Sequence, residues 1–321
     1  MTDSIKLRLV MDVVFSPNGT PTDQLIDALS TAGADLVSAG VITGSSSASI
    51  IEVSTSVEDM TPKARHHEEL ASGSDAVIVP ADDEFITVPE VTLPNGVIVP
   101  SFKVGKFVCS PGEESAVGAV CEDLGDNVRR KAAVTAQGLP WVNIDYHDAR
   151  EACTAAGYTL LTETQWLAIA WDAANVDENW TGGKVGKGAM YQGLRDGTVR
   201  RAQPGTFEPS EASQRRWKRL SNGEVIFDIG GNVWQWIFDD VQGNQSGIIK
   251  TEFAKDSVSL MAPASSEKKG MGWRPDAGAD WSGYAPLRGG YWGSGTYAGP
   301  FYLGDVTPSY TYSSIGFRCT K

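Results

Sequence analysis

The sequence predicts an α+β protein of two parts, a small N-terminal module followed by a larger domain of short strands and helices. Three observations lead to this prediction. Residues 5–15 place apolar side chains at every second position, the period of a strand with a buried face. From Phe85 onward, short apolar runs are interrupted by Pro and Gly, as in a chain of many short strands. All ten tryptophans lie between Trp141 and Trp292, so the large aromatic core belongs to the second part.

Charge and hydropathy exclude several classes of function. The 321 residues carry a net charge of −13 at pH 7, so no electrostatic attraction to nucleic acid or to an anionic membrane is expected. No apolar run approaches the ~18–20 residues of a membrane span, so no membrane insertion is expected. The start at Met1–Ser4 lacks a basic stretch followed by an apolar one. We therefore expect no signal peptide and assembly in the cytoplasm.

The first module, residues 1–60, is predicted to have the element order β-α-β-β. Its first strand turns at Asn18-Gly19, and Thr22 is a typical cap for the helix that follows. Residues 35–42 and 48–58 then form two strands. Nothing in this module marks a catalytic site. We interpret it as an attachment or oligomerisation module, through which the protein would form a homo-oligomer or join a virion.

Residues 61–84 are polar and charged, which is typical of a linker. The adjacent His66 and His67 are interpreted as solvated linker residues, because neighbouring side chains on a helix diverge. The second domain is therefore predicted to cover residues 85–321.

The second domain begins with strands and continues with two helices. Strands are expected at 85–91, 97–100 and 102–109. A helix is expected over about 146–156, with Ala149, Ala152, Cys153 and Ala156 on one face and Gly157 after its end. Thr162 and Gln165 have the spacing of a capping box. The helix after it carries core residues at i, i+3, i+4 and i+7, namely Trp166, Ile169, Ala170 and Ala173.

The remainder alternates between loops and short motifs. Residues 175–220 are Gly-rich and end in a basic cluster at 215–219, interpreted as solvated or internally paired. Residues 228–236 combine tight-turn residues with a short strand whose Trp234 and Trp236 lie on one side. Residues 242–286 form a long polar excursion, and loops of this length are usually functional or mobile.

The four cysteines show no CxxC spacing, so no metal or redox motif is indicated. Cys109, Cys121, Cys153 and Cys319 are each interpreted as small buried apolar residues. A disulfide between Cys109 and Cys121 stays open, because it depends on the compartment. No cofactor is expected. The acidic chain is compatible with a structural Ca²⁺ or Mg²⁺ ion, but no spacing marks its ligands.

Five motifs in order give the second domain a family resemblance. They are the helix after Pro140, Thr159–Trp166, Asp228–Trp236, Arg288–Trp292 and Gly316–Cys319. Together they resemble the formylglycine-generating-enzyme branch of the C-type lectin fold, over residues 85–321. The resemblance implies that fold, preceded here by the small α+β module. Thr159 and Leu161 depart from the family motif, which has Arg and Pro at these positions.

The chemistry of that family is not implied, because its reactive residues are missing. Its oxidase members use a copper-binding cysteine pair after the motif that Arg288–Trp292 matches, and no cysteine lies between Cys153 and Cys319. Its iron-dependent members use three histidines from a separate helical bundle, and only His66, His67 and His147 are present. We therefore expect no catalytic residues. The alternative is a formylglycine-generating-type oxidase or a degenerate relative of one.

The C-terminal segment is more similar to the variable proteins of diversity-generating retroelements, which display a hypervariable segment on this fold. Their recurring pattern matches Arg288, Gly289, Gly290, Trp292, Gly295, Ala298, Gly299, Phe301 and Leu303. Mutation of AAC codons at adenines cannot produce Lys, Glu, Gln, Trp or Met, and residues 293–314 contain none of these five. The resemblance implies a variable region at 291–314. Its variable set comprises Tyr291, Gly293, Ser294, Thr296, Tyr297, Tyr302, Gly304, Asp305, Thr307, Tyr310, Tyr312, Ser313 and Ser314.

The expected function is that of a non-catalytic ligand-binding display protein, viral or prophage-encoded. Its variable surface would recognise a host-surface protein or glycan and so set receptor binding and tropism, from a virion or tail. Tyr, Ser, Gly and Thr dominate the variable set, and the same residues dominate antibody paratopes. Trp234, Trp236 and Trp292 are expected to form the core floor under this surface. The identity of the ligand stays open.

Overall fold

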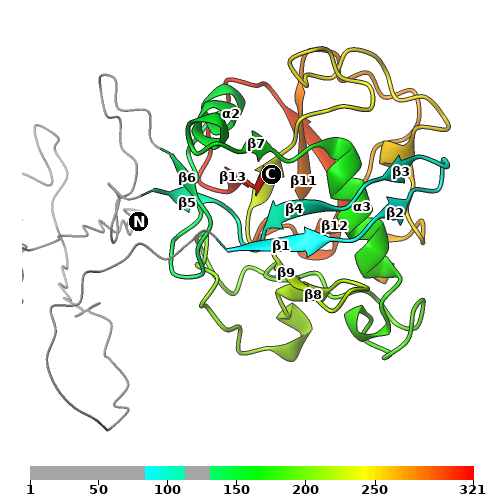
Figure 1. Cartoon of the computed structure of the whole chain (residues 1–321). Helices are drawn as coiled ribbons and strands as arrows, with labels where there is room; N and C mark the ends of the chain where they lie inside the picture. The colour runs from blue at the N-terminus through cyan, green and yellow to red at the C-terminus, as the bar shows by residue number, and fades with distance from the viewer. Residues whose placement is uncertain (1–83, 113–130) are drawn as a thin grey trace, which may run out of the picture. The chain divides into compact units, whose positions relative to one another are not determined.

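The computed structural model describes residues 84–112 and 131–321 (Figure 1). By its contacts the chain divides into two units, Met1–Ile78 and Val79–Lys321. The predicted module at 1–60, nearly all of the linker at 61–84, and Cys121 lie outside the described residues. The structural statements below concern the described part of the second unit.

The first sheet joins the beginning and the end of the described domain. Its four strands pair in the antiparallel order β1 (Phe85–Val88), β4 (Phe102–Gly105), β14 (Cys319–Thr320) and β7 (Thr159–Leu160). The strand predicted at 85–91 is interrupted at Pro89, which has no N–H for a ladder. The chain resumes as the hairpin β2 (Val91–Thr92) and β3 (Ile98–Val99).

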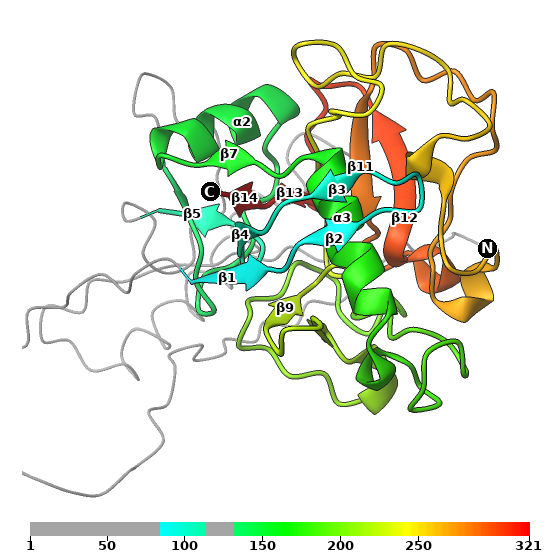
Figure 2. The same cartoon turned by 45° about the vertical axis from the view of Figure 1, so that its right-hand side comes forward.

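The second sheet carries the C-terminal segment. Its order is β12 (Gly299–Val306), β11 (Ala285–Gly289), β10 (Trp234–Trp236) and β13 (Ile315–Phe317), and only β13 runs parallel to its neighbour. Figure 2 shows β11 and β12 side by side, next to the yellow-to-orange segment that contains residues 242–286. Two further antiparallel pairs are β5 (Ser110–Pro111) with β6 (Ala132–Ala133) and β8 (Trp217–Arg219) with β9 (Val225–Phe227).

Both predicted helices form with the predicted faces. Helix α2 (Tyr146–Ala155) is capped by Asp145 and buries Ala149, Ala152 and Cys153. Helix α3 (Glu163–Ala174) begins with the predicted capping box, in which the Thr162 and Gln165 side chains each bond the other's backbone N–H. Short 3-10 turns lie at Asp177–Asn179, Ala212–Gln214, Val258–Leu260, Glu267–Lys269 and Gly295–Tyr297.

Two apolar clusters fill the space between these elements. Helix α3 packs with β1, β4 and β12 in the first, where the four predicted core residues of α3 are at most 1% exposed. Helix α2 packs with β7, β10, β13 and β14 in the second. The second cluster contains three buried thiols, with Cys319 Sγ 2.7 Å from Cys153 Sγ and 3.3 Å from Cys109 Sγ. Burial raises the pKa of the Cys109 thiol, which therefore stays protonated.

The basic cluster at 215–219 is largely paired inside the protein. Arg216 is buried and donates from Nε and Nη2 to the two carboxylate oxygens of Asp228, at 2.9 and 2.6 Å. The Arg215 guanidinium lies between the rings of Tyr191 and Trp217, 3.9 and 3.8 Å from their centroids. These contacts leave little of the cluster available for an external anion.

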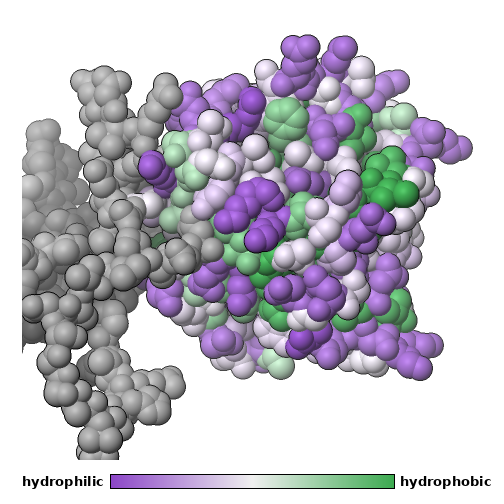
Figure 3. Space-filling view, viewed as in Figure 1, coloured by the Kyte–Doolittle hydropathy of each residue, from purple (hydrophilic) through white to green (hydrophobic). Residues whose placement is uncertain are grey.

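The surface in the view of Figure 3 is largely hydrophilic. An apolar group lies over the β2–β3 hairpin, where Val97 and Ile98 are exposed. Within the described part of the chain, every helix is too short or too polar to cross a bilayer.

Unlike Arg215 and Arg216, Lys218 of the basic cluster at 215–219 has no partner for its charged group in the described part of the chain. Its Nζ atom is buried and has no hydrogen-bond partner among the described residues. Burial, followed by the charge of Arg215, lowers the pKa of Lys218 to about 7. An unfolded lysine has a pKa of about 10.4. Between these values the unfolded chain binds more protons than the folded one, so stability rises with pH across this window.

We therefore expect Lys218→Met to stabilise the protein at pH 7 by on the order of 1–4 kcal/mol, since it removes an unpaired buried amine. The variant should also lose the rise in stability between pH 7 and 10. Urea unfolding across this pH range measures both effects. Lys250→Met, at an exposed lysine, is the matched control and should change neither. A wild-type stability that stays flat from pH 7 to 10 would contradict the buried amine.

Candidate ligand-binding surface

Arg288 lies on β11 and anchors the β11–β12 pair, from which the loops at 291–298 and 307–314 extend. Its side chain is completely buried, and all five of its N–H groups donate hydrogen bonds. Two go to the carboxylate of Glu163 at the start of α3. The other three go to the carbonyls of Phe301, Tyr302 and Ser259, each at 3.1 Å. One side chain thus holds α3, β12 and the 242–286 segment together.

The two glycines after Arg288 let the chain turn away from β11. Gly289 and Gly290 have φ angles of 91° and 85°, which side chains strongly disfavour. A Cβ on Gly290 would also lie 2.8 Å from the Cα of Ala298. The segment 291–298 therefore leaves the sheet and returns within a tightly closed loop.

The loop 291–298 is held by its backbone. Gln192 Nε2 donates to the carbonyls of Thr296 and Ala298, at 3.0 and 2.5 Å. The N–H of Gly295 donates to the carbonyl of Arg195 at 2.9 Å. Since none of these bonds uses a side chain of the loop, the loop side chains can change while the backbone keeps its position.

The loop 307–314 is held in the same way. The N–H of Asn143 donates to the carbonyl of Tyr312 at 3.1 Å, and the N–H of Tyr146 to that of Pro308 at 3.0 Å. At the end of the loop, the N–H of Trp234 donates to the carbonyl of Ser314 at 2.8 Å. The first residue of α2, the segment before it and strand β10 therefore position this loop without constraining most of its side chains.

The members of the variable set differ in exposure. The large exposed side chains are Tyr297, Tyr310 and Tyr312, at 53%, 43% and 49%. The other exposed members are Gly293, Thr296, Thr307 and Ser313, and the half-buried ones are Tyr291, Ser294, Tyr302 and Asp305. These residues come from both loops and from β12.

Two members of the set lie inside the protein. Ser314 is completely buried, where the chain enters β13. Gly304 is buried under the ring of Tyr302, and a Cβ there would lie 2.6 Å from the Tyr302 hydroxyl. Neither presents a side chain to a ligand. The sequence pattern could not separate them from the others, because burial at these positions depends on strand pairing and on a neighbouring ring.

The three tryptophans that were expected to lie in the core under this surface differ in burial. Trp236 is completely buried and donates from Nε1 to the carbonyl of Ile144 at 3.0 Å. Trp292 is half-buried. Trp234 is also half-buried, and its ring centroid lies 4.3 Å from that of Tyr291 and 6.4 Å from that of Tyr302. Trp234 therefore borders the variable side chains directly.

Two ionisable groups of the variable set have shifted pKa values. Burial raises the pKa of Tyr302 to about 12, so its hydroxyl stays protonated at neutral pH. Burial also raises the pKa of the Asp305 carboxyl. Over residues 84–112 and 131–321, His147 is the one histidine and it lies on α2. In the same ranges no cluster of three His, Cys, Asp or Glu side chains is arranged to hold a metal ion.

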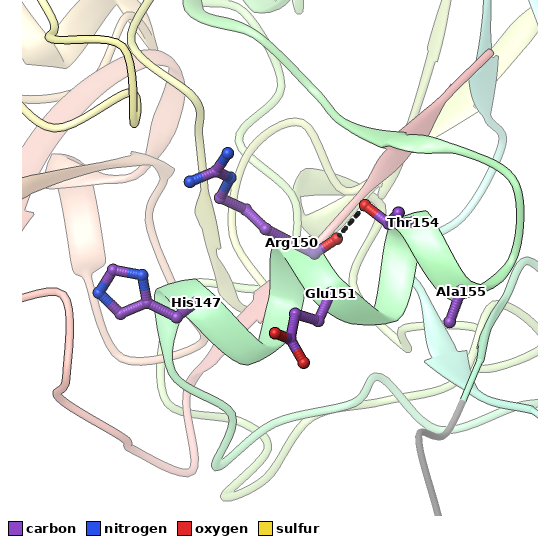
Figure 4. A pocket seen from close by; sticks show the side chains of 5 residues that line it. All are labelled: His147, Arg150, Glu151, Thr154 and Ala155. Carbon is purple, nitrogen blue, oxygen red and sulfur yellow. Dashed lines mark hydrogen bonds between the residues drawn. The ribbon is translucent and has the colours of Figure 1, made fainter.

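Two cavities lie outside the variable set. A cavity of about 570 Å³ is lined by His147, Arg150, Glu151, Thr154 and Ala155 of α2 (Figure 4). A second one of about 250 Å³ is lined by ten residues, including Arg215, Trp217 and Phe227. The first lies along one face of α2 and carries no sequence motif. The second includes Arg215, Arg216 and Trp217 of the basic cluster, which the sequence does not mark as the lining of a cavity.

Removal of Arg288 tests whether its side chain anchors β12. Arg288→Met should destabilise the protein by about 3–5 kcal/mol, because it leaves the buried Glu163 carboxylate unpaired. The double variant Arg288→Met/Glu163→Leu should recover a large part of this loss. Urea unfolding at pH 7 gives both values.

The control is Arg195→Met, which breaks the partly exposed pair of Arg195 and Asp196. It should cost less than about 1 kcal/mol. Equal stability of Arg288→Met and Arg195→Met would contradict the anchoring role.

Comparison with known families and known proteins gives one family match. The family described as "Sulfatase-modifying factor enzyme 1-like domain" matches residues 93–321. No curated protein matches the chain.

Several solved structures are similar to the chain. PvdO from Pseudomonas aeruginosa has a TM-score of 0.41 and 16% identity, over 74% of this chain and 94% of that chain. Treponema denticola variable protein 1 has a TM-score of 0.31 and 16% identity, over 74% and 93%. The Major Tropism Determinant M1 variant has a TM-score of 0.32 and 13% identity, over 72% of this chain and 51% of that chain. This chain thus spans about half the length of the last protein.

Proposed function

Since the chain belongs to the sulfatase-modifying factor enzyme 1-like family, we propose that it uses this scaffold for binding and not for catalysis. In this proposal the domain is a ligand-binding display protein with the C-type lectin fold. Residues 291–314 are the variable region of a diversity-generating retroelement. The ligand is a protein or glycan on a host surface, and binding it determines tropism.

The observation that carries the proposal is the contrast in burial along one segment. Of the residues that match the fixed pattern, Arg288, Gly289, Gly290, Ala298, Gly299, Phe301 and Leu303 are buried, and Trp292 and Gly295 are half-buried. Of the thirteen members of the variable set, eleven are exposed or half-buried, and Gly304 and Ser314 are buried. A segment selected for changeable side chains on a constant backbone would have this distribution.

The side chains of the exposed positions support a recognition role. Tyrosine combines a large contact area with a hydroxyl and has few rotatable bonds, so its ordering on binding loses little entropy. Tyr310 and Tyr312 stack on each other with their ring centroids 6.0 Å apart. The Thr and Ser residues around them add adaptable hydrogen bonds.

The attachment of this protein is part of the same proposal. The N-terminal residues 1–60 would join the domain to a virion tail or to further copies of the chain. Several copies would raise the effective concentration of a surface whose single-site affinity is modest.

The alternative is an oxidase of the formylglycine-generating type, and family membership is the observation that favours it. The sequence departs from it at the reactive positions, since no cysteine lies between Cys153 and Cys319. Stoichiometric copper or iron in the purified protein would favour the oxidase and count against the display function.

The coding DNA tests the retroelement directly. We expect a near-identical template repeat in the neighbouring DNA, with a reverse-transcriptase gene beside it. The differences between repeat and gene should fall at adenines in the codons of the variable set and spare the codons of Arg288, Phe301 and Leu303. Sequencing the flanking DNA is the measurement. Flanking DNA without such a repeat would contradict the retroelement, because the variable region would then have no template from which its changes are copied.

The stability of substituted variants tests whether the three exposed tyrosines lie outside the core. The triple variant Tyr297→Ser/Tyr310→Ser/Tyr312→Ser should lose less than about 1.5 kcal/mol of stability, because surface changes cost little. Phe301 is completely buried on β12. The variant Phe301→Ala should therefore lose about 3–5 kcal/mol of stability. Urea unfolding of both variants gives the comparison. Equal losses would mean that the tyrosines belong to the core.

A further inference from the structure

Six aromatic side chains form an unbroken row that begins in the variable region and ends in the 242–286 segment. The order of contact is Trp292, Tyr291, Trp234, Tyr302, Trp273 and Trp281. Successive ring centroids are 5.3, 4.3, 6.4, 6.3 and 6.3 Å apart. These separations are close to those at which aromatic rings attract each other. We call these six residues the aromatic row.

The part of the row that lies outside the variable region is built into the edge of the second sheet. The N–H of Phe301 donates to the carbonyl of Met271 at 2.8 Å, and the N–H of Leu303 to that of Trp273 at 2.9 Å. Residues 271–273 thus cover the open edge of β12. The backbone of Trp273 is therefore fixed relative to the variable strand.

The 242–286 segment and β12 approach each other closely at two glycines, which have no side chain to keep the backbones apart. A Cβ on Gly272 would lie 2.6 Å from the backbone nitrogen of Tyr302. A Cβ on Gly299 would lie 2.5 Å from the carbonyl oxygen of Gly270. The polar excursion is thus matched to β12 at a specific register, which brings Trp273 against the Tyr302 ring.

All six members of the row are half-buried. Tryptophans that serve the core of this protein, such as Trp166 and Trp236, are at most 1% exposed. A contiguous set of large, partly exposed aromatic side chains is the composition of an interaction site. Core packing accounts for the buried faces of these rings and leaves the exposed faces without a structural role.

We infer that the aromatic row is one binding platform for a folded protein, and that Trp273 and Trp281 of the 242–286 segment are contact residues in it. This inference rests on the proposed display function and names its partner class. Protein interfaces have an aromatic centre poor in charge and a polar rim. The row contains no charged side chain, and the Ser and Thr residues of the variable set supply such a rim.

The row contains both members of the variable set and residues outside it. Tyr291 and Tyr302 belong to the variable set, whereas the four tryptophans do not. Every variant of the surface therefore keeps the same tryptophan anchors. Such anchors supply most of the affinity in a protein interface, and the exchangeable side chains around them decide which partner fits.

Selection from a library tests the inference with defined probes. The full chain is randomised at the exposed positions Thr296, Tyr297, Thr307, Tyr310 and Tyr312. It is selected in parallel against immobilised ubiquitin and immobilised maltoheptaose. The dissociation constants of selected clones are then measured before and after Trp273→Ala and Trp281→Ala. Trp217→Ala is the matched control, since Trp217 is half-buried on β8 and outside the row.

The expected result is a set of clones that bind ubiquitin and none that bind maltoheptaose. Each tryptophan removal in the row should weaken binding at least tenfold, and Trp217→Ala should change it less than twofold. Trp273→Phe keeps an aromatic ring and should retain most of the affinity. This variant separates a lost contact from a misfolded segment if Trp273→Ala unfolds.

Three results would overturn the inference. Ubiquitin binders insensitive to both tryptophan removals would leave the display function standing and exclude these two residues from the platform. Clones that bind only maltoheptaose would show that the partner class is wrong. An absence of binders to both probes would count against the display function as well.

Discussion

The ion pair between Arg288 and Glu163 is the interaction on which the arrangement of the C-terminal segment depends. Both side chains are buried, and a buried charge is strongly destabilising unless it is paired and hydrogen-bonded. Arg288 meets this requirement with all five of its donors, directed to α3, β12 and the 242–286 segment. Because these donors have fixed directions in a planar guanidinium, they define the relative positions of the three elements. Strand β12 is thus held at its backbone by Arg288, in addition to the packing of its buried Phe301 and Leu303 side chains.

The same separation between backbone and side chain recurs along the whole segment. Gln192 and Asn143 hold carbonyls of the loops at 291–298 and 307–314, and the sheet holds β12. A carbonyl is present whatever residue carries it, so these bonds survive substitution. One hydrogen bond within the loop at 291–298 does use a loop side chain, the bond from the Tyr291 N–H to the Ser294 hydroxyl at 2.9 Å. The physical requirement for a changeable surface is a backbone held from outside, and this fold meets it.

The 242–286 segment shows how a polar excursion without regular structure can be well positioned. Its position depends on the Arg288 bond to Ser259, on the close approach of Gly272 to β12, and on bonds from β12 to residues 271–273. An uncovered edge strand would expose unpaired N–H and C=O groups and invite aggregation. Covering the edge and presenting Trp273 beside Tyr302 are two consequences of one contact.

Local sequence signals were sufficient to predict the two helices and their ends. The capping box at Thr162, the apolar stripe of α3 and the stop of α2 near Gly157 each depend on residues within one or two turns, so they could be read without a fold. The C-terminal segment was located by its resemblance to a family pattern, since the segment has no clear period of its own. Burial of Ser314 and Gly304, the meeting of Cys109, Cys153 and Cys319, and the row from Tyr291 to Trp281 could not be read in this way. Each joins residues far apart in the chain, and no local pattern encodes which of them pack together. The sequence by itself thus determined where the two helices and several of the strands lie. Only the tertiary structure decided which side chains share a surface, because that depends on strand pairing and packing between distant segments.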